Sequence, residues 1–401
     1  MAILASSGSG VSASPFAGLS PLLQRLASPA WCHPGFAPYW PLLRRLWHMA
    51  WKAAGCPEGP LPVFCVTPQG GMRVDDQMTP GIQIPDGLSL GASAVGAQAM
   101  GASSTVGPDG AGRVSRDASP VDLPLSTWDT VHWLPFMNRL AAWRGLRAPD
   151  GTPLRFVAGS DVGAVDYERS VASGQIPCKL EGAGARHDFH NALVWLRFPR
   201  LKSAINQLHC RQADTGRRLR EVSLADCHAA AHPPARGRGA LRDALTLLDE
   251  NGALWPAADP AWVALLEARQ WTALFVERRQ MLLGGKSLEG DAIQMDCLRP
   301  PGTFLGSHVP VIVGHGLLEK LHQPYKSMTA KLLPCSDPRG SLDWGTARRL
   351  WTLAREGELR PALLQPLPIQ GWPGWDPANA DPAFYRDEKV FRGPRPACDV
   401  K

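Results

Sequence analysis

The chain has 401 residues, enough to bury a substantial core in one or two domains. Hydrophobic residues make up 44% and charged residues 19%, a balance that excludes an intrinsically disordered chain. The formal net charge of +6 permits an acidic partner, nucleic acid included, but does not require one.

The nine cysteines are scattered and odd in number, and no two form a CxxC pair. This pattern predicts reduced thiols rather than a disulfide framework. Residues 1–20 lack the charged and apolar regions of a signal peptide, and no window is apolar enough to cross a bilayer. We therefore predict a cytoplasmic protein without a membrane partner.

Composition divides the chain into three parts. Residues 1–30 are small and polar apart from Pro21–Leu26, and we expect a flexible N-terminal extension there. Residues 67–125 consist largely of Gly, Ala, Ser and Pro without periodicity, which predicts a disordered, low-complexity insertion. The remaining segments, 31–66 and 126–395, are predicted to form a single globular domain.

Apolar periodicity predicts helices that begin near Pro41 and Ser126, followed by a short strand at Pro153–Val157. The apolar run around Val194 is interpreted as a buried strand. A helix is then expected from Pro199 to about residue 209.

Another helix is predicted from Ala240 to Glu250, because Asn251-Gly252 is a typical helix end. Val309–Val313 is the next predicted strand, with a helix after it, and Met328–Leu333 is a further strand. The connection between these two strands is long enough for a right-handed crossover.

These elements predict an α+β fold that is mainly helical, with one small mixed β-sheet. The sheet is expected to carry the strands near Val157, Val194, Val313 and Thr329. The tail from residue 366 to 391 is rich in proline and aromatic residues and is expected to be extended.

The densest group of polar side chains is His187, Asp188, His190 and Asn191, which directly precedes an apolar run. Imidazole and carboxylate groups serve as general bases and as ligands of divalent metals. His187 is the predicted general base, with Asp188 and Asn191 beside it; His187, Asp188 and His209 are the predicted metal ligands. The alternative is a turn cluster that only satisfies backbone groups.

Asp243 and Glu250 lie two turns apart on one face of the helix predicted at 240–250. Carboxylates in this arrangement can act as a base or as metal ligands, and Asp243 is a further catalytic candidate. The alternative is a solvated acidic face.

Gly314-His315-Gly316 lies between a predicted strand and a predicted helix. Gly314 and Gly316 would let an anion approach the backbone amides, His315 would act on it, and Lys320 and Lys331 would add positive charge. Because the complete glycine pattern of a nucleotide-binding loop is missing, a tight packing turn is the alternative.

Three further patterns favour simpler explanations. His228 and His232 are one helical turn apart, a spacing that zinc sites use, but the glutamate of a metalloprotease helix is missing. The basic run Arg197–Arg220 lacks interleaved aromatic residues, so we interpret it as a solvated helix face. Residues 372–379 are expected to pack over the core, because tryptophan is mostly buried.

Several of these segments, taken in order from about Trp31 to Arg395, resemble one known family, the bacterial domain of unknown function numbered three thousand and twenty-five. The resemblance implies membership without an assigned activity. It also implies one cluster formed by His187, Asp188, Asn191, Asp243, His315, Glu319 and Lys331. The matching pieces are His187–Trp195 with Phe198-Pro199 and Lys202, Arg242–Leu247 with Asp249–Asn251, Gly314–Leu321, Thr329–Lys331, Pro366–Pro368, Gly371–Trp375, Asn379, Phe384-Tyr385 and Val390-Phe391.

Three functional hypotheses follow. The first is a metal-dependent hydrolase of phosphoesters, nucleases included, with a divalent metal as cofactor and His187 as general base. The second is a non-catalytic interaction protein whose polar cluster only stabilises the core. The third is transfer chemistry on a small anionic metabolite bound at 314–316.

Overall fold

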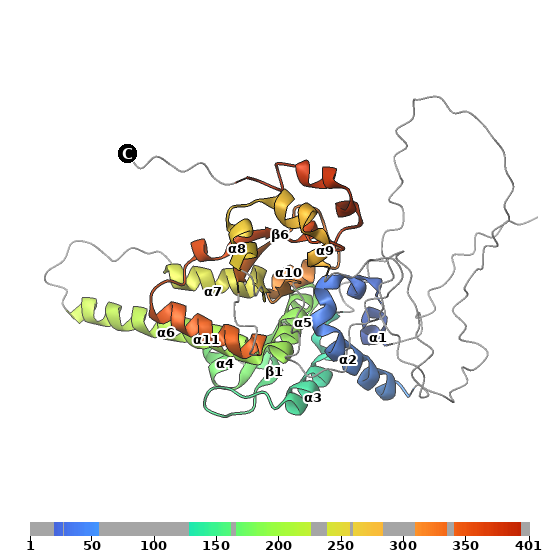
Figure 1. Ribbon diagram of the computed structural model, residues 1–401. Coiled ribbons are helices and arrows are strands. Elements are labelled where there is room, and N and C mark those ends of the chain that lie inside the picture. Colours follow the sequence, from blue (N-terminus) through green and yellow to red (C-terminus); the bar gives the residue numbers. More distant parts are fainter. Residues whose placement is uncertain are drawn as a thin grey trace, which may run out of the picture.

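A computed structural model describes residues 20–26, 28–55, 128–161, 166–225, 239–256, 260–283, 309–334 and 341–393. It confirms a mainly helical α+β fold (Figure 1). None of the helices in these ranges combines the length and the apolar character that crossing a membrane demands. The insertion predicted at 67–125 and the pair His228 and His232 lie outside the described residues.

Eleven helices are described, besides short 3₁₀ and π turns. They are α1 (Pro21–Leu26), α2 (Trp40–Ala53), α3 (Leu134–Arg144), α4 (Tyr167–Ala172), α5 (Gly182–Arg197), α6 (Pro199–Ala225), α7 (Ala240–Asn251), α8 (Pro260–Glu267), α9 (Arg279–Leu282), α10 (His315–Lys320) and α11 (Leu342–Arg355).

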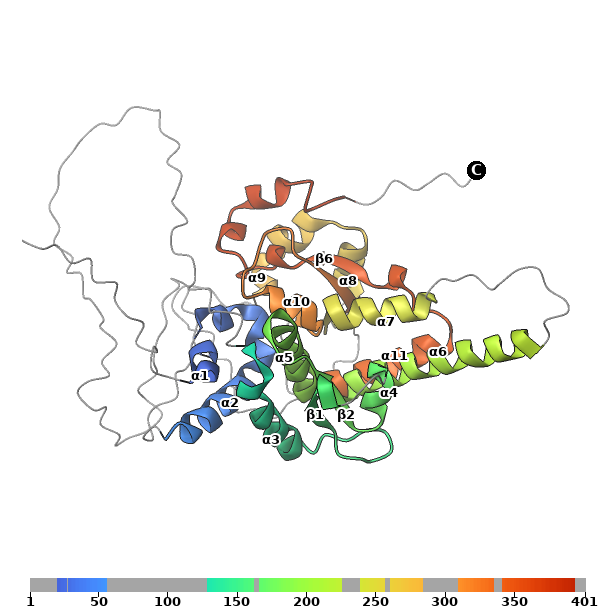
Figure 2. The same cartoon turned by 180° about the vertical axis from the view of Figure 1, so that it is seen from behind.

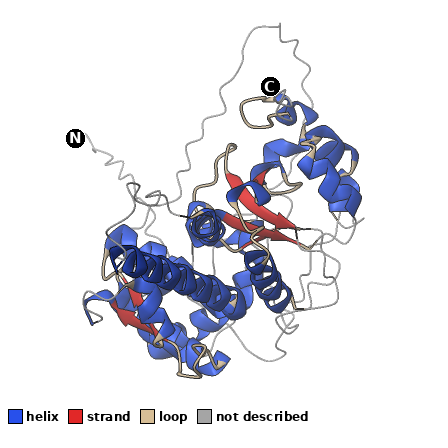
Figure 3. Ribbon diagram, turned by 90° about the vertical axis from the view of Figure 1, so that its left-hand side faces the viewer, coloured by secondary structure: helices blue, strands red, loops and turns tan. Residues whose placement is uncertain are grey.

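The strands form two separate sheets instead of the single sheet that we predicted (Figure 3). In the smaller sheet, β1 (Arg155–Ala158) runs parallel to β2 (Gln175–Cys178). The larger sheet has the order β4-β3-β5-β6, in which β3 is parallel to β5 and the outer pairs are antiparallel. Its strands are β3 (Gly252–Trp255), β4 (Val311–Ile312), β5 (Thr329–Pro334) and β6 (Gln365–Pro368).

The strand predicted around Val194 is wrong, because this residue lies within helix α5. Residues 192–196 are all buried, so the helix is covered on every side and shows no amphipathic period there. A short apolar run of this kind cannot be distinguished from a buried strand by periodicity alone. The next helix, α6, extends to Ala225, well beyond the predicted end near residue 209.

The crossover predicted between Val309–Val313 and Met328–Leu333 is also wrong. β4 pairs with β3 and not with β5, and it runs antiparallel to both. The parallel neighbour of β5 is β3, which starts at Gly252 directly after α7. A Cβ atom at this glycine would collide with the carbonyl oxygen of Leu248, so the immediate change from helix to strand needs glycine.

The tail predicted to be extended contains β6 and three short 3₁₀ turns, the first of which is Ile369–Gly371. The 3₁₀ turns later in the tail begin at Pro377 and Pro382. The carboxylate of Asp376 accepts a hydrogen bond from the backbone amide of Ala378, and that of Asp381 accepts one from the amide of Ala383. Capping by these aspartates stabilises turns in place of an extended chain, and the proline and aromatic content of the tail did not indicate these turns.

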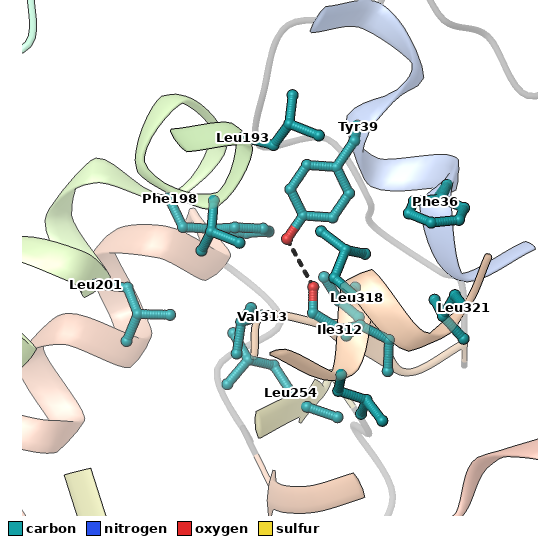
Figure 4. Packing of buried hydrophobic residues seen from close by; sticks show 14 of the residues in the cluster. Phe36, Tyr39, Leu193, Phe198, Leu201, Leu254, Ile312, Val313, Leu318 and Leu321 are labelled. Atoms are coloured by element: carbon teal, nitrogen blue, oxygen red, sulfur yellow. Dashed lines mark hydrogen bonds between the residues drawn. The ribbon is translucent and has the colours of Figure 1, made fainter. Parts of the chain in front are cut away.

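The N-terminal segment packs on the larger sheet and on α5. Tyr39 is fully buried, and its hydroxyl donates a hydrogen bond to the carbonyl oxygen of Ile312 at 2.7 Å (Figure 4). Figure 4 shows Leu193, Phe198 and Leu318 around the same ring. Helix α1 (Pro21–Leu26) lies within the predicted N-terminal extension and buries three leucines, Leu22, Leu23 and Leu26. The core therefore joins segments that are far apart in the sequence.

Candidate metal centre

Three helices bring an imidazole–imidazole–carboxylate group together. His187 lies in the second turn of α5, Glu250 in the last turn of α7, and His315 at the first position of α10. Helix α10 packs against both α5 and α7, which places the three side chains at one junction. The views in Figures 1 and 2 agree on this arrangement of the helices.

The distances between the three ligand-type atoms are short. The Nε2 atoms of His187 and His315 are 2.9 Å apart. Glu250 Oε1 is 3.8 Å from His187 Nε2 and 3.5 Å from His315 Nε2. The point equidistant from these three atoms is about 2.0 Å from each, close to the roughly 2.0–2.2 Å of Zn–N and Zn–O bonds. The three side chains can therefore coordinate one cation without a change of fold.

The Nδ1 atoms of the two imidazoles have different surroundings. His187 Nδ1 lies 3.1 Å from Glu319 Oε2, and Arg186 Nε donates to the other oxygen of Glu319 at 2.6 Å. His315 Nδ1 lies 3.8 Å from Asp249 Oδ1, too far for a hydrogen bond, and has no hydrogen-bond partner among the described residues. A carboxylate at Nδ1 is the usual partner of a metal-binding histidine, because it fixes the tautomer that leaves the Nε2 lone pair free.

The carboxylates around the centre favour positive charge. Glu250 and Glu319 raise the pKa of His187 to about 9. Burial lowers the pKa of His315 to about 4. Burial acts to raise the pKa of Glu319, but the hydrogen bond with His187 and the nearby charge of His190 and Arg186 bring it down to about 2. This point of the molecule therefore stabilises either a proton on His187 or a cation.

The two glycines around His315 allow the close approach of α10 to α7. A Cβ atom at Gly316 would lie 2.5 Å from Glu250 Oε2. One at Gly314 would lie 2.5 Å from the backbone nitrogen of Asn251, and the amide of Gly314 donates to the carbonyl of Gly252 at 2.9 Å. Both glycines therefore have a packing role that brings His315 to Glu250.

The centre is open to solvent on one side. The side chains of His187 and Glu250 are 28% and 39% exposed, whereas that of His315 is 6% exposed. A cation bound here would keep a coordination position accessible to water, as in catalytic zinc sites and unlike the closed sites of structural zinc.

Among the other predicted site residues, several lie elsewhere. Asp188 accepts the backbone amide of Lys179 at 2.6 Å, and Asn191 donates to the hydroxyl of Tyr167 at 3.0 Å. His209 is buried in α6, and Asp243 lies in the first turn of α7, two turns from Glu250.

The two lysines predicted to bind an anion occupy different elements. Lys320 is exposed at the last position of α10, and Lys331 is half-buried on β5, where it is the register partner of Gly252. Among the described residues, neither lysine forms an ion pair with a carboxylate. The structure thus brings together His187, His315 and the two glycines of the predicted set.

Glu250 and Glu319 were the residues that sequence reasoning undervalued. Glu250 was named with Asp243 as a carboxylate that could act as a base or a metal ligand, but it was left out of the predicted ligand set. Glu319 entered only through the family resemblance. The spacing of His315 and Glu319, four residues apart in a short helix, could have identified the second, because residues at i and i+4 share a face. The shared face with Asp243 indicated Glu250 as a possible ligand, but no local signal joined it to His187 and His315, because that contact depends on where α7 ends.

A family model described as "Protein of unknown function (DUF3025)" matches residues 154–289 and 303–395, which is more than half of the chain. His187, Glu250, His315 and Glu319 all lie within the matched ranges. No curated protein and no solved structure matches the chain.

Proposed function

The chain belongs to this family of proteins of unknown function, and we propose from the geometry of the centre that it is a metal-dependent hydrolase. The observation that supports the proposal is the convergence of His187 Nε2, His315 Nε2 and Glu250 Oε1 around one point, with Glu319 accepting a hydrogen bond from His187 Nδ1.

The donor set favours a borderline divalent cation, with zinc first, since two imidazoles and one carboxylate are also the ligands of known hydrolytic zinc sites. Such a cation lowers the pKa of a coordinated water to about 7 and supplies a nucleophile at neutral pH. Glu319 would hold the imidazole of His187 in the binding orientation. The open side next to His187 and Glu250 would admit the substrate.

His187 is assigned here as a ligand, whereas the sequence suggested a general base. Both of its ring nitrogens are used, one toward the centre and one toward Glu319. The proposed ligand set also replaces Asp188 and His209 by Glu250 and His315, because the Asp188 carboxylate is bound to the Lys179 amide.

Titration calorimetry of the full chain with Zn²⁺, Mn²⁺ and Ni²⁺ tests the metal half of the proposal. We expect one cation per chain, and at least a hundredfold weaker binding in His187→Ala, Glu250→Ala and His315→Ala. His48→Ala is the matched control, since His48 is an exposed histidine on α2. Binding that all four variants retain would refute the assigned ligand set, provided that circular dichroism shows them folded.

Hydrolysis of three p-nitrophenyl substrates, a phosphodiester, a phosphomonoester and a carboxylic ester, tests the catalytic half. We expect turnover of at least one by the metal-loaded chain and none after chelation. Stoichiometric metal binding without any turnover would contradict the hydrolase and leave a metal-binding protein. The non-catalytic alternative would be supported if none of the metals bound to the chain and none raised its melting temperature.

A further inference from the structure

Helices α6 and α11 pack along each other (Figure 2), and the surface over their contact is rich in arginine. Two open cavities of about 610 and 680 Å³ adjoin there and share Arg348 and Trp351 in their walls. Within the described part of the chain, no aspartate or glutamate lines either cavity. The arginines that line them are Arg144, Arg147, Arg200, Arg211, Arg348 and Arg355. We call this surface the α6–α11 groove.

The positive charge of the groove is balanced only in part, by the charge of Asp343 near Arg144 and Arg200. None of its six arginines forms an ion pair with a described residue. Asp343, the acid next to the start of α6, is buried, and its two oxygens accept the backbone amides of Arg200 and Leu201. Asp214 of α6 pairs with Arg169, which is outside the groove. Unpaired surface arginines attract an anionic partner.

The groove also contains two tryptophans, and both come from α11. Trp344 and Trp351 are seven residues apart, so they lie on the same face two turns apart, with Arg348 between them. Trp344 is 44% exposed, and the Arg348 guanidinium lies 5.4 Å from its ring centre. The guanidinium of Arg211, from α6, lies 4.5 Å from the ring centre of Trp351. Aromatic and basic side chains therefore alternate across the two helices.

We propose that the α6–α11 groove binds single-stranded nucleic acid. Arginines would contact the phosphates, and the exposed face of Trp344 would stack on an unpaired base, as in other sequence-tolerant single-strand sites. An acidic peptide would use the charge but not the flat ring. A duplex hides the faces of its bases in the stack, so it would use the charge alone.

The groove is separate from the candidate metal centre. His187 lies near the start of α5, whereas Arg144 donates to the carbonyl of Leu196 at the end of that helix and Arg200 follows it in α6. The ten residues from His187 to Arg197 correspond to about 15 Å of helix at 1.5 Å per residue. Binding at the groove consequently does not rest on the proposed hydrolase activity.

Fluorescence anisotropy of the full chain with labelled single strands of thymidine and uridine, twenty nucleotides each, tests the proposal. We expect binding that weakens with salt, with a logarithmic slope of about −0.7 for each phosphate contact. Trp344→Ala should weaken binding roughly tenfold, since stacking of one base on an aromatic ring contributes about 1–3 kcal/mol. Trp344→Phe should restore most of the affinity, and Arg348→Ala should lower both the affinity and the salt slope.

Two matched controls lie outside the groove. Tyr325→Ala removes an aromatic residue that is 52% exposed, and Arg386→Ala removes an exposed arginine of the C-terminal segment. We expect both to bind like the unmodified chain. Unchanged affinity in Trp344→Ala would overturn the proposal, and so would equal binding of a duplex or of polyglutamate, which would indicate a site for charge alone. Preference between the thymidine and uridine strands identifies DNA or RNA as the natural class.

Discussion

At the residue scale, the candidate metal centre depends on side chains that never touch the proposed cation. Glu319 accepts from His187 Nδ1 and from Arg186, so it is held from two sides and in turn fixes the imidazole. Asp249 Oδ1 lies 3.8 Å from His315 Nδ1, too far for a hydrogen bond, and pairs with Lys202. The imidazole of His187 is therefore held through its Nδ1 atom, whereas that of His315 is held by the packing around it, with 6% of its side chain exposed.

Replacing Glu319 by glutamine should weaken metal binding about 10–100-fold, because the amide is a poorer acceptor for His187 and no longer pairs with Arg186. Calorimetric titration with Zn²⁺ measures the change. Glu358→Gln, at an exposed position after α11, is the control and should bind like the unmodified chain. Equal affinity in both variants would show that Glu319 does not orient the ligand.

Tyr39→Phe tests the junction between the N-terminal segment and the larger sheet. The substitution keeps the buried ring but removes the hydrogen bond to the Ile312 carbonyl. The free energy of unfolding should fall by about 1–2 kcal/mol, since the carbonyl loses a buried donor. Urea denaturation gives this value. Tyr325→Phe, at a ring that is 52% exposed, should leave stability unchanged; an equal loss in both would contradict a specific role for Tyr39.

At the scale of elements, helix α4 is linked to α6 through the partly buried carboxyl group of Glu168. Burial raises the pKa of Glu168 to about 7, although Asn206 donates to its carboxylate at 2.6 Å. Lys202 opposes the shift, and Asp249 and Asp166 add to it. Glu168 is consequently a group whose ionisation differs between the folded and unfolded chain.

The sign of the resulting pH dependence follows from the two pKa values. Glu168 has a pKa of about 7 in the folded chain and 4.5 as its ordinary value. Between pH 4.5 and 7 the folded chain keeps the proton of Glu168, whereas the unfolded chain has lost it. The contribution of Glu168 to stability is therefore complete below pH 4.5 and is lost as pH rises through 7. Glu168→Gln should remove this pH-dependent contribution to the free energy of unfolding, which amounts to roughly 1.4 kcal/mol per unit of difference between the two pKa values.

Denaturation of the unmodified chain and of Glu168→Gln at pH 4.5, 5.5, 6.5 and 7.5 checks this prediction. The difference between the two free energies of unfolding should shift in favour of the glutamine variant as pH rises. A difference that stays constant over the series would contradict a raised pKa at Glu168. The comparison cancels other groups that titrate in the same range, because both proteins share them.

Several elements could be predicted from the sequence because their signals are local. The helix over 240–250 has an amphipathic period and a glycine stop, and the structure has α7 at Ala240–Asn251. Strand β5 was predicted at Met328–Leu333 and spans Thr329–Pro334. Helix α5 was misjudged because its buried apolar run has no exposed face. Strand β3 was missed because Asn251-Gly252 was interpreted only as a helix end, whereas β3 starts at Gly252 directly after α7.

The candidate site was predictable only in part, because only some of its residues have a local signal in the sequence. His187 and His315 stand out as histidines next to regular elements. Glu250 could be predicted as a possible ligand from its helix face, but it joins the two histidines only through the meeting of α7 with α10, a contact between residues more than sixty positions apart. Likewise, the basic stretch of α6 lacked aromatic residues in the sequence, whereas the structure supplies Trp344 and Trp351 from α11.

At the scale of the whole molecule, the family match starts at residue 154, but the core does not. Trp31, Phe36 and Tyr39 are fully buried, and Trp31 and Phe36 lie against the rings of His190 and His322. Met137 and Leu140 of α3 are buried in the same cluster. The segments before residue 154 thus cover faces of the matched region.

A fragment of residues 150–395 should therefore lose cooperative unfolding, since it exposes the surfaces that α1, α2 and α3 cover in the full chain. We expect a broad thermal transition and a weak near-ultraviolet circular dichroism signal, against a single sharp transition for the full chain. The thermal transition of the fragment is also compared with that of the fragment mixed with a separate peptide of residues 20–55. A fragment with the same melting temperature as the full chain would show that the N-terminal segments are dispensable.

The central claim is that two histidines and one glutamate, from α5, α10 and α7, hold a single cation. An anomalous difference map from crystals grown with Zn²⁺ tests it most directly. We expect one strong peak, about 2.0–2.2 Å from His187 Nε2, His315 Nε2 and Glu250 Oε1. A map without a peak at this junction, or with the zinc bound by other side chains, would contradict the account.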